Sequence, residues 1–133
     1  MREIKFRGKR IVNGEWVYGY YEFLRTPLIH WMEEYRMGGM LCLAQVDPST
    51  VGQYTGLKDK NGTEIYEGDV LKSVAYGYVG EVKYVPENAA FLVFWSDDKG
   101  RHAGYLDDGM CSRIEVIGNI HDNPELLGGV KND

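Results

Sequence analysis

Several segments of the chain alternate apolar and polar residues with the period of two that is typical of β-strands. Two such runs fill residues 4–24, and the dipeptide Asn13-Gly14 lies between them. Because Asn-Gly is the preferred dipeptide of a type I′ turn, these residues predict a β-hairpin with a tight turn. A second Asn-Gly, Asn61-Gly62, joins two short extended pieces within residues 57–65 and predicts a further hairpin.

The second half of the chain has the pattern of an antiparallel meander. Its apolar segments have the length of strands, and turn-forming residues separate them at Gly77, Pro86-Glu87-Asn88 and Lys99-Gly100. Four or five short strands, introduced by the Glu67-Gly68-Asp69 turn, indicate a small β-barrel of the SH3-like kind. The predicted strands are residues 70–76, 80–85, 90–95 and 114–120, with a weaker one at 102–106.

Residues 26–37 fit two kinds of element. Thr26 could cap a helix that starts at Pro27 and closes at Gly38-Gly39, yet the apolar residues between them also suit a strand. We favour a strand-rich excursion with at most a short helix. The remaining expectations are a strand at 40–46, a turn at 47–50 that ends it and could start one helical turn, a helical turn at 123–127, and a polar tail from residue 128.

The composition agrees with a β protein of ordinary domain size. The 133 residues include 17 glycines, ten tyrosines, four phenylalanines and three tryptophans, which suit tight turns and half-buried sheet surfaces. The length excludes a two-domain enzyme with an interdomain cleft. We therefore expect a mainly β fold with one or two short helices. It comprises an N-terminal hairpin region at 1–56, a barrel-like module at 57–127 and a tail at 128–133, with 1–127 forming one integrated domain.

The charge is unevenly distributed along the chain. The net charge is −5, but the first ten residues carry +4, which leaves −9 for the rest. A general DNA-coating protein would be basic, so that class is excluded. In the predicted hairpin, cations share one face of the first strand and aromatic residues share one face of the second, an arrangement that suits single-stranded nucleic acid. The acidic remainder of the chain favours the alternative, a solvated basic face with the aromatic residues packed against the core or a neighbouring subunit. The residues concerned are Lys5, Arg7, Lys9, Trp16, Tyr18 and Tyr20.

Three groups of residues have the side chains of a metal site but not its spacing. The segment from Asp59 to Glu64 lacks the ligand positions of an EF-hand calcium loop. Two acidic pairs with a histidine between them could gather around Mg²⁺, but no second carboxylate cluster fixes their geometry. Two cysteines and two histidines lack the short spacing of structural zinc sites. We therefore expect no catalytic residue, metal or cofactor, and a metal-dependent phosphoryl-transfer enzyme is the least favoured function. The residues weighed are Asp97, Asp98, His102, Asp107 and Asp108 for magnesium, and Cys42, His102, Cys111 and His121 for zinc.

The expected cellular location follows from two kinds of segment that the sequence pattern does not show, a secretory signal and a membrane helix. The first residues lack the apolar run of a secretory signal, and the longest apolar run, 89–95, is shorter than the roughly 20 residues of a membrane helix. The two cysteines, Cys42 and Cys111, are few for an exported protein stabilised by disulfides. We expect a cytoplasmic protein with free thiols and no membrane partner.

A distinctive motif crosses the middle of the chain. It consists of Gly52, Gln53, Tyr54, Thr55, Gly56, Asp59, Asn61, Gly62, Ile65, Tyr66, Glu67, Gly68 and Asp69. The segment from Val46 to Val70 that holds these residues resembles the signature of the YopX family, small proteins of bacteriophages, prophages and their bacterial hosts, and residues 2–7, 16–19 and 115–127 resemble that family too. The resemblance implies a mostly β fold and a phage or prophage origin, and it transfers no catalytic residues. We interpret the motif as a turn-rich structural connector between the two parts of the chain.

These observations favour a non-enzymatic binding or regulatory protein that acts through protein–protein contacts in the bacterial host cell. Since aromatic residues and methionine are enriched at the centres of interfaces, we expect homo-oligomerisation, with a phage or host protein as a further candidate partner. Single-stranded nucleic-acid binding through the N-terminal hairpin is the main alternative. Four later aromatic residues either line a groove or pack half-buried: Tyr54, Tyr66, Trp95 and Tyr105.

Overall fold

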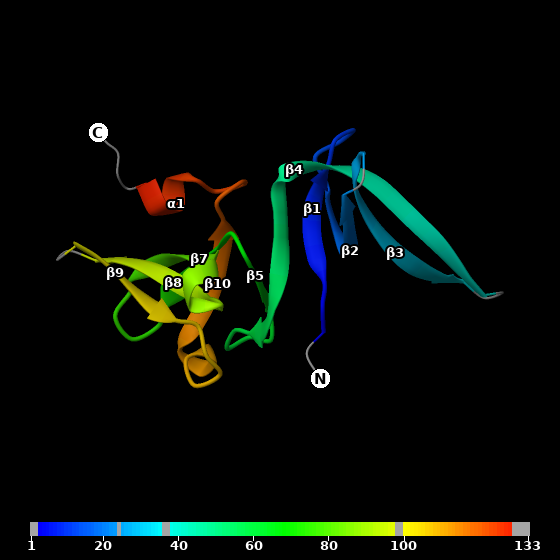
Figure 1. Cartoon of the computed structure of the whole chain (residues 1–133). Helices are drawn as coiled ribbons and strands as arrows, with labels where there is room; N and C mark the ends of the chain where they lie inside the picture. Colours follow the sequence, from blue (N-terminus) through cyan, green and yellow to red (C-terminus); the bar gives the residue numbers. More distant parts are fainter. Residues whose placement is uncertain (1–2, 24, 36–37, 98–99, 129–133) are drawn as a thin grey trace. The chain divides into compact units, whose positions relative to one another are not determined.

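The fold is mainly β, as the sequence predicts. The computed structural model describes residues 3–23, 25–35, 38–97 and 100–128. The chain divides into two compact units, the N-terminal unit (Met1–Tyr54) and the C-terminal unit (Thr55–Asp133). Each has its own set of antiparallel strands (Figure 1). Whether residues 1–127 act as one integrated domain stays a prediction.

The N-terminal unit is formed by three strands and the greater part of a fourth. These are β1 (Phe6–Arg10), β2 (Trp16–Phe23), β3 (Pro27–Tyr35) and β4 (Gly38–Lys58). Each strand pairs with the next, and β1 also pairs with the middle of β4. Beyond His30, the described part of β3 pairs with β4 alone, so the two form a two-stranded arm (Figure 1). The preference for strand over helix is therefore confirmed for 27–35, whereas residues 36 and 37 lie outside the described residues.

The first hairpin forms as predicted, but its turn differs from the expected type. Gly14 has φ +73°, whereas Asn13 does not have the positive φ that a type I′ turn requires. The N–H of Gly14 donates to the carbonyl of Arg10, so the loop spans residues 11–14. The side-chain oxygen of Asn13 accepts the N–H of Glu15 at 3.0 Å. This local hydrogen bond favours the wider loop over the two-residue turn.

Strand β4 continues through residues 47–50, where the sequence pattern predicted a turn with a helical start, so that prediction is wrong. The pairing of β4 with β1 shifts in register within this segment. Arg7 lies opposite Gly52, whereas Lys9, two residues on, lies opposite Asp47. The Thr50 hydroxyl accepts the N–H of Lys9 at 2.9 Å and donates to the carbonyl of Asp47. The long-range bond from Lys9 and the local one to Asp47 hold this segment as a bulge in the strand, and β4 bends there (Figure 1).

The C-terminal unit contains a five-stranded antiparallel sheet in the order β10-β6-β7-β8-β9. A short strand, β5 (Glu64–Tyr66), lies beside β4 in the other sheet. Two 3₁₀ turns (Pro86–Asn88 and Cys111–Arg113) and the helical turn α1 (Glu125–Gly128) complete the unit. The strands of the sheet are β6 (Asp69–Ser73), β7 (Val79–Val85), β8 (Ala90–Asp97), β9 (Gly100–Tyr105) and β10 (Ile114–Asn119).

The five strands predicted in this region are thus confirmed, as is the helical turn before the tail, except that residues 74–76, predicted as the end of the first strand, form a turn. One face of the sheet packs on the hydrophobic core. β9 and β10 lie at the two ends of the pairing order, so closure into an SH3-like barrel stays a prediction. The core residues are Ile65, Leu71, Val82, Phe91, Val93, Trp95, Leu106 and Ile114.

Candidate functional site

The register of the first hairpin places the predicted cations and aromatic residues on the same face. Arg7 lies opposite Tyr18, and Lys9 lies opposite Trp16. Since alternate residues of a strand share a face, Tyr20 points to that side as well. Lys5 lies just before β1 in the same alternation. The hairpin therefore brings the six candidate residues to one surface.

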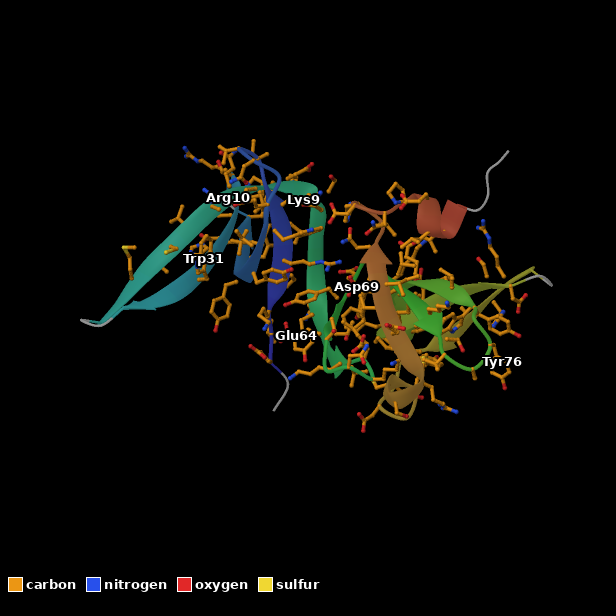
Figure 2. The ribbon with its side chains drawn as sticks, turned by 180° about the vertical axis from the view of Figure 1, so that it is seen from behind. Lys9, Arg10, Trp31, Glu64, Asp69 and Tyr76 are labelled. Carbon is orange, nitrogen blue, oxygen red and sulfur yellow. The ribbon has the colours of Figure 1, made fainter. Side chains whose placement is uncertain are left out.

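The cations of this surface already have aromatic partners within the unit. The Arg7 guanidinium carbon lies 4.6 Å from the centre of the Trp16 ring, and only 6% of Arg7 is exposed. The Lys9 ammonium, labelled in Figure 2, lies 5.5 Å from the same ring. The Lys5 ammonium lies 5.3 Å from the ring of buried Tyr54. Cation–π contacts of this kind stabilise the unit, and they occupy groups that a nucleic acid would need.

The surface continues onto β3 and β4, where it is apolar. Tyr20 lies opposite His30, and His30 lies opposite Leu43. Tyr20 is 70% exposed and Leu41 is 61% exposed, so both side chains project into solvent. We call Tyr18, Tyr20, Leu41 and Leu43 the apolar face; all four are exposed.

A shallow pocket of about 230 Å³ opens in the apolar face. His30 Nε2 and Glu22 Oε1 lie 2.7 Å apart at its edge, without the alignment of a hydrogen bond. The lining is otherwise apolar, which suits a hydrophobic side chain held beside one polar pair. The lining residues are Tyr20, Glu22, His30, Trp31 and Leu41; Figure 2 labels Trp31.

Sequence reasoning missed the β3 and β4 part of this surface. Leu41 and Leu43 alternate in a segment predicted as a strand, but the alternation does not say which side is covered. His30 and Glu22 are near neighbours only because β2 pairs with β3. The signal that could have located them is the even spacing of Tyr18, Tyr20 and Glu22 along one strand.

The centre of the motif is organised by the Asp59 carboxylate. One of its oxygens accepts the N–H groups of Asn61 and Thr63, at 2.8 and 2.9 Å, and the other accepts the N–H of Val116. Burial by itself raises the pKa of Asp59, but these three hydrogen bonds and nearby Lys60 outweigh it and bring the pKa below its ordinary value. The Asn61-Gly62 turn that the sequence predicts forms around this side chain, with Gly62 at φ +83°.

Other motif residues also hold the backbone. The Thr55 hydroxyl donates to the carbonyl of Ile65 at 2.8 Å, and the buried Asp69 carboxylate, labelled in Figure 2, accepts the N–H of Tyr66 at 2.7 Å. Gly56 and Gly68 have φ of +88° and +91°. The motif is divided between the units, since Gly52, Gln53 and Tyr54 lie in the N-terminal unit and the rest in the C-terminal unit, where Glu67 forms part of the turn before β6. These side chains bond to the backbone of the fold, and the role of the motif as a structural connector stays a prediction.

The described residues weighed as metal ligands do not form a group of three. His102 Nδ1 lies 3.7 Å from Asp97 Oδ2, and Asp107 accepts the N–H of Met110, while Asp98 lies outside the described residues. Within ranges 3–23, 25–35, 38–97 and 100–128, no three His, Cys, Asp or Glu residues are placed to hold a metal ion. In the same ranges no helix is both long and apolar enough to cross a membrane.

The two cysteines are free thiols, as predicted. Cys42 lies on the arm and Cys111 lies in the 3₁₀ turn before β10. Burial raises the pKa of the Cys111 thiol, and the carboxylates of Asp108 and Asp107 raise it further. A raised pKa lowers the thiolate fraction, so Cys111 lacks the activation of a nucleophilic cysteine.

Comparison with known proteins gives a family and a structural neighbour. The model of the YopX protein family matches residues 5–128. The chain is similar to the crystal structure of protein EF1440 from Enterococcus faecalis, with 26% sequence identity, a TM-score of 0.55, and coverage of 96% of this chain and 99% of that one. None of the curated proteins compared with the chain matches it.

Proposed function

The chain belongs to the YopX family, and from that premise and the apolar face we propose that it is a non-enzymatic binding protein that associates with further copies of itself. The observation that carries the proposal is the apolar face, whose large exposed side chains come from β2 and β4 on the two sides of β3. Exposed apolar clusters of this kind mark interaction sites, and tyrosine is enriched in them.

The arm supports a second copy as the occupant. Beyond His30, the described residues of β3 pair with β4 alone, so one edge of the arm has no strand beside it. An open edge next to apolar side chains favours pairing with another strand. A second copy has the same open edge and the same apolar face. Association through the arm would therefore pair the two edges and cover the two apolar faces together.

The same proposal covers the wider setting of the protein. The family's resemblance to phage, prophage and bacterial host proteins supports a phage or host protein in the bacterial cytoplasm as a further class of partner. The apolar face and the pocket beside His30 would serve that partner as well. Binding to this surface needs no catalytic group or cofactor.

Solution mass is the direct test. We expect the purified protein to be larger than its 15.2 kDa monomer by light scattering, and the double variant Tyr20→Ser/Leu41→Ser to be monomeric. The matched control is Tyr76→Ser, which removes an equally exposed tyrosine (74%) from the C-terminal unit and keeps the mass unchanged. A wild-type protein that stays monomeric at about 100 μM contradicts the proposal.

Single-stranded nucleic acid is the second candidate partner, because Lys5 and Lys9 lie near Tyr18 and Tyr20 on one surface. It has less support, since Arg7 is buried and Trp16 already contacts two cations. Binding would weaken steeply with salt and on replacing Lys5 and Lys9. The absence of a mobility shift with single-stranded DNA or RNA at about 50 mM salt removes this candidate.

A metal-dependent enzyme is the remaining candidate. It requires a stoichiometric divalent ion on the purified protein and a rise in melting temperature when Mg²⁺ or Zn²⁺ is added. Elemental analysis and a thermal-shift assay together decide it.

A further inference from the structure

The β10-β6-β7-β8-β9 sheet holds a pocket on the face opposite the hydrophobic core, and the proposed self-association does not use it. Its volume is about 290 Å³, and three neighbouring strands and the segment around α1 line it. Glu81 of β7 lies opposite Phe94 of β8, and Ser96 of β8 lies opposite Arg101 of β9. The lining residues are Glu81, Lys83, Phe94, Ser96 and Arg101 from the sheet, with Pro124 and Leu127 from the C-terminal segment.

The pocket combines an apolar floor with an excess of positive charge. Phe94 is 37% exposed, and the Lys83 ammonium lies 5.2 Å from the centre of its ring. Arg101 is exposed on the neighbouring strand, on the other side of Phe94. The single carboxylate, Glu81, lies 4.0 Å from the Lys83 ammonium and is mostly covered. Two cations therefore meet one carboxylate around an accessible ring.

The wall formed by Pro124 and Leu127 is held in place by the residues before it. Asn119 accepts the N–H of Asp122 on its side chain and that of Asn123 on its carbonyl. A Cβ added to Gly118 would lie 2.5 Å from Asn123 Oδ1 and 2.8 Å from Leu126 Cδ1, so the segment packs directly on β10. The wall is thus part of the folded unit, and the pocket is formed before any ligand arrives.

We propose that this pocket binds an acidic peptide segment of a partner protein. An apolar side chain of the peptide lies on Phe94 against Pro124 and Leu127, and flanking carboxylates pair with Lys83 and Arg101. Charge complementarity selects the acidic peptide, because the two cations outnumber the one carboxylate of the lining. The apolar floor and wall favour a peptide over a bare anion, because a bare anion has no apolar group to pack against them.

The test uses a hexapeptide with leucine and phenylalanine between two pairs of acidic residues. Backbone amide shifts of the full chain are followed by NMR during the titration. We expect shifts confined to the pocket strands and α1, and an affinity that falls about tenfold in Arg101→Glu. The control Lys58→Glu makes the same kind of charge change on an exposed cation at the end of β4 and keeps the affinity.

Two further probes separate the contributions. A peptide with serines in place of leucine and phenylalanine should lose binding, as should the variant Phe94→Ser, whose fold is checked by its own amide spectrum. Three results would overturn the proposal: no shift with the acidic peptide at about 1 mM, equal shifts with a peptide carrying lysines in place of the acidic residues, or complete displacement by inorganic phosphate at a similar concentration.

Discussion

The Asp59 carboxylate accepts the backbone N–H of Val116 at 2.9 Å, although 57 residues separate the two in sequence. The same carboxylate closes the Asn61-Gly62 turn through two local hydrogen bonds. One side chain therefore fixes a turn and ties it to strand β10. Its removal leaves three backbone donors without their acceptor.

Asp59→Ala should destabilise the protein by about 2–4 kcal/mol, because three partly buried donors lose a charged acceptor. Urea denaturation at neutral pH measures the loss. Asp107→Ala is the control, since that exposed carboxylate accepts a backbone hydrogen bond from Met110, and its loss should cost less than about 1 kcal/mol. Equal losses of unfolding free energy in the two variants would show that the Asp59 hydrogen bonds add no more stability than the single bond of Asp107.

The pH dependence of stability should follow from Asp59. Its folded-state pKa lies below the ordinary value, so its ionised form stabilises the fold. That contribution is complete above the unfolded-state pKa of about 3.9 and is lost as the pH falls through the lower folded-state pKa. We expect the gap in unfolding free energy between wild type and Asp59→Asn to be widest near neutral pH and to shrink below about pH 4. Denaturation curves along a pH series measure it, and a gap that stays constant would contradict the assignment.

Gly19→Ala should disrupt the N-terminal unit. A Cβ at this position would collide with the backbone carbonyl oxygen of His30, where β2 and β3 pass one another. Because a backbone atom cannot move aside without breaking the pairing, we expect a loss of about 3 kcal/mol. The control is Gly104→Ala, whose Cβ would have its nearest neighbour, Trp95 Nε1, at 4.0 Å. Thermal unfolding compares the two, and similar melting temperatures would refute the prediction.

Cys111 should react slowly with alkylating reagents. Burial, with Asp108 and Asp107, raises its pKa and keeps the sulfur protonated at neutral pH. In the Cys42→Ser variant, mass spectrometry should show iodoacetamide labelling of Cys111 at least about tenfold slower in the native protein than in urea. Labelling at the same rate in both states would mean that the fold does not protect the thiol.

The strands could be predicted because their signal is local. Alternation and the Asn-Gly dipeptides located the first hairpin and the turn around Asp59, and the apolar segments of the C-terminal unit gave all five strands of its sheet. The path of β4 through residues 47–50 could not be predicted. Asp47-Pro48-Ser49-Thr50 has the local chemistry of a turn, but the pairing of β4 with β1 on both sides of it, and the hydrogen bond from Lys9 41 residues away in sequence, keep it in the strand.

The candidate surfaces could be predicted only in part. Strand periodicity was enough to place Arg7 and Lys9 on one face, but it could not show that Arg7 is buried against Trp16. The exposure of Leu41 and the proximity of Glu81 to Phe94 depend on which strands pair and in which register. Those pairings join residues far apart in the sequence, so no local pattern contains them.

The pairing of β6 with β10 has a consequence for synthesis. Ser73 lies opposite Ile114, so about 40 residues must be made after β6 before its second neighbour exists. At a ribosomal rate of about 5–20 residues per second, that edge of the nascent sheet waits about 2–8 s without its partner. During that interval the unpaired edge of β6 is open to chaperones and to aggregation. The wall of the pocket follows β10 in the chain and packs on it, so the pocket forms only after β10 has been made.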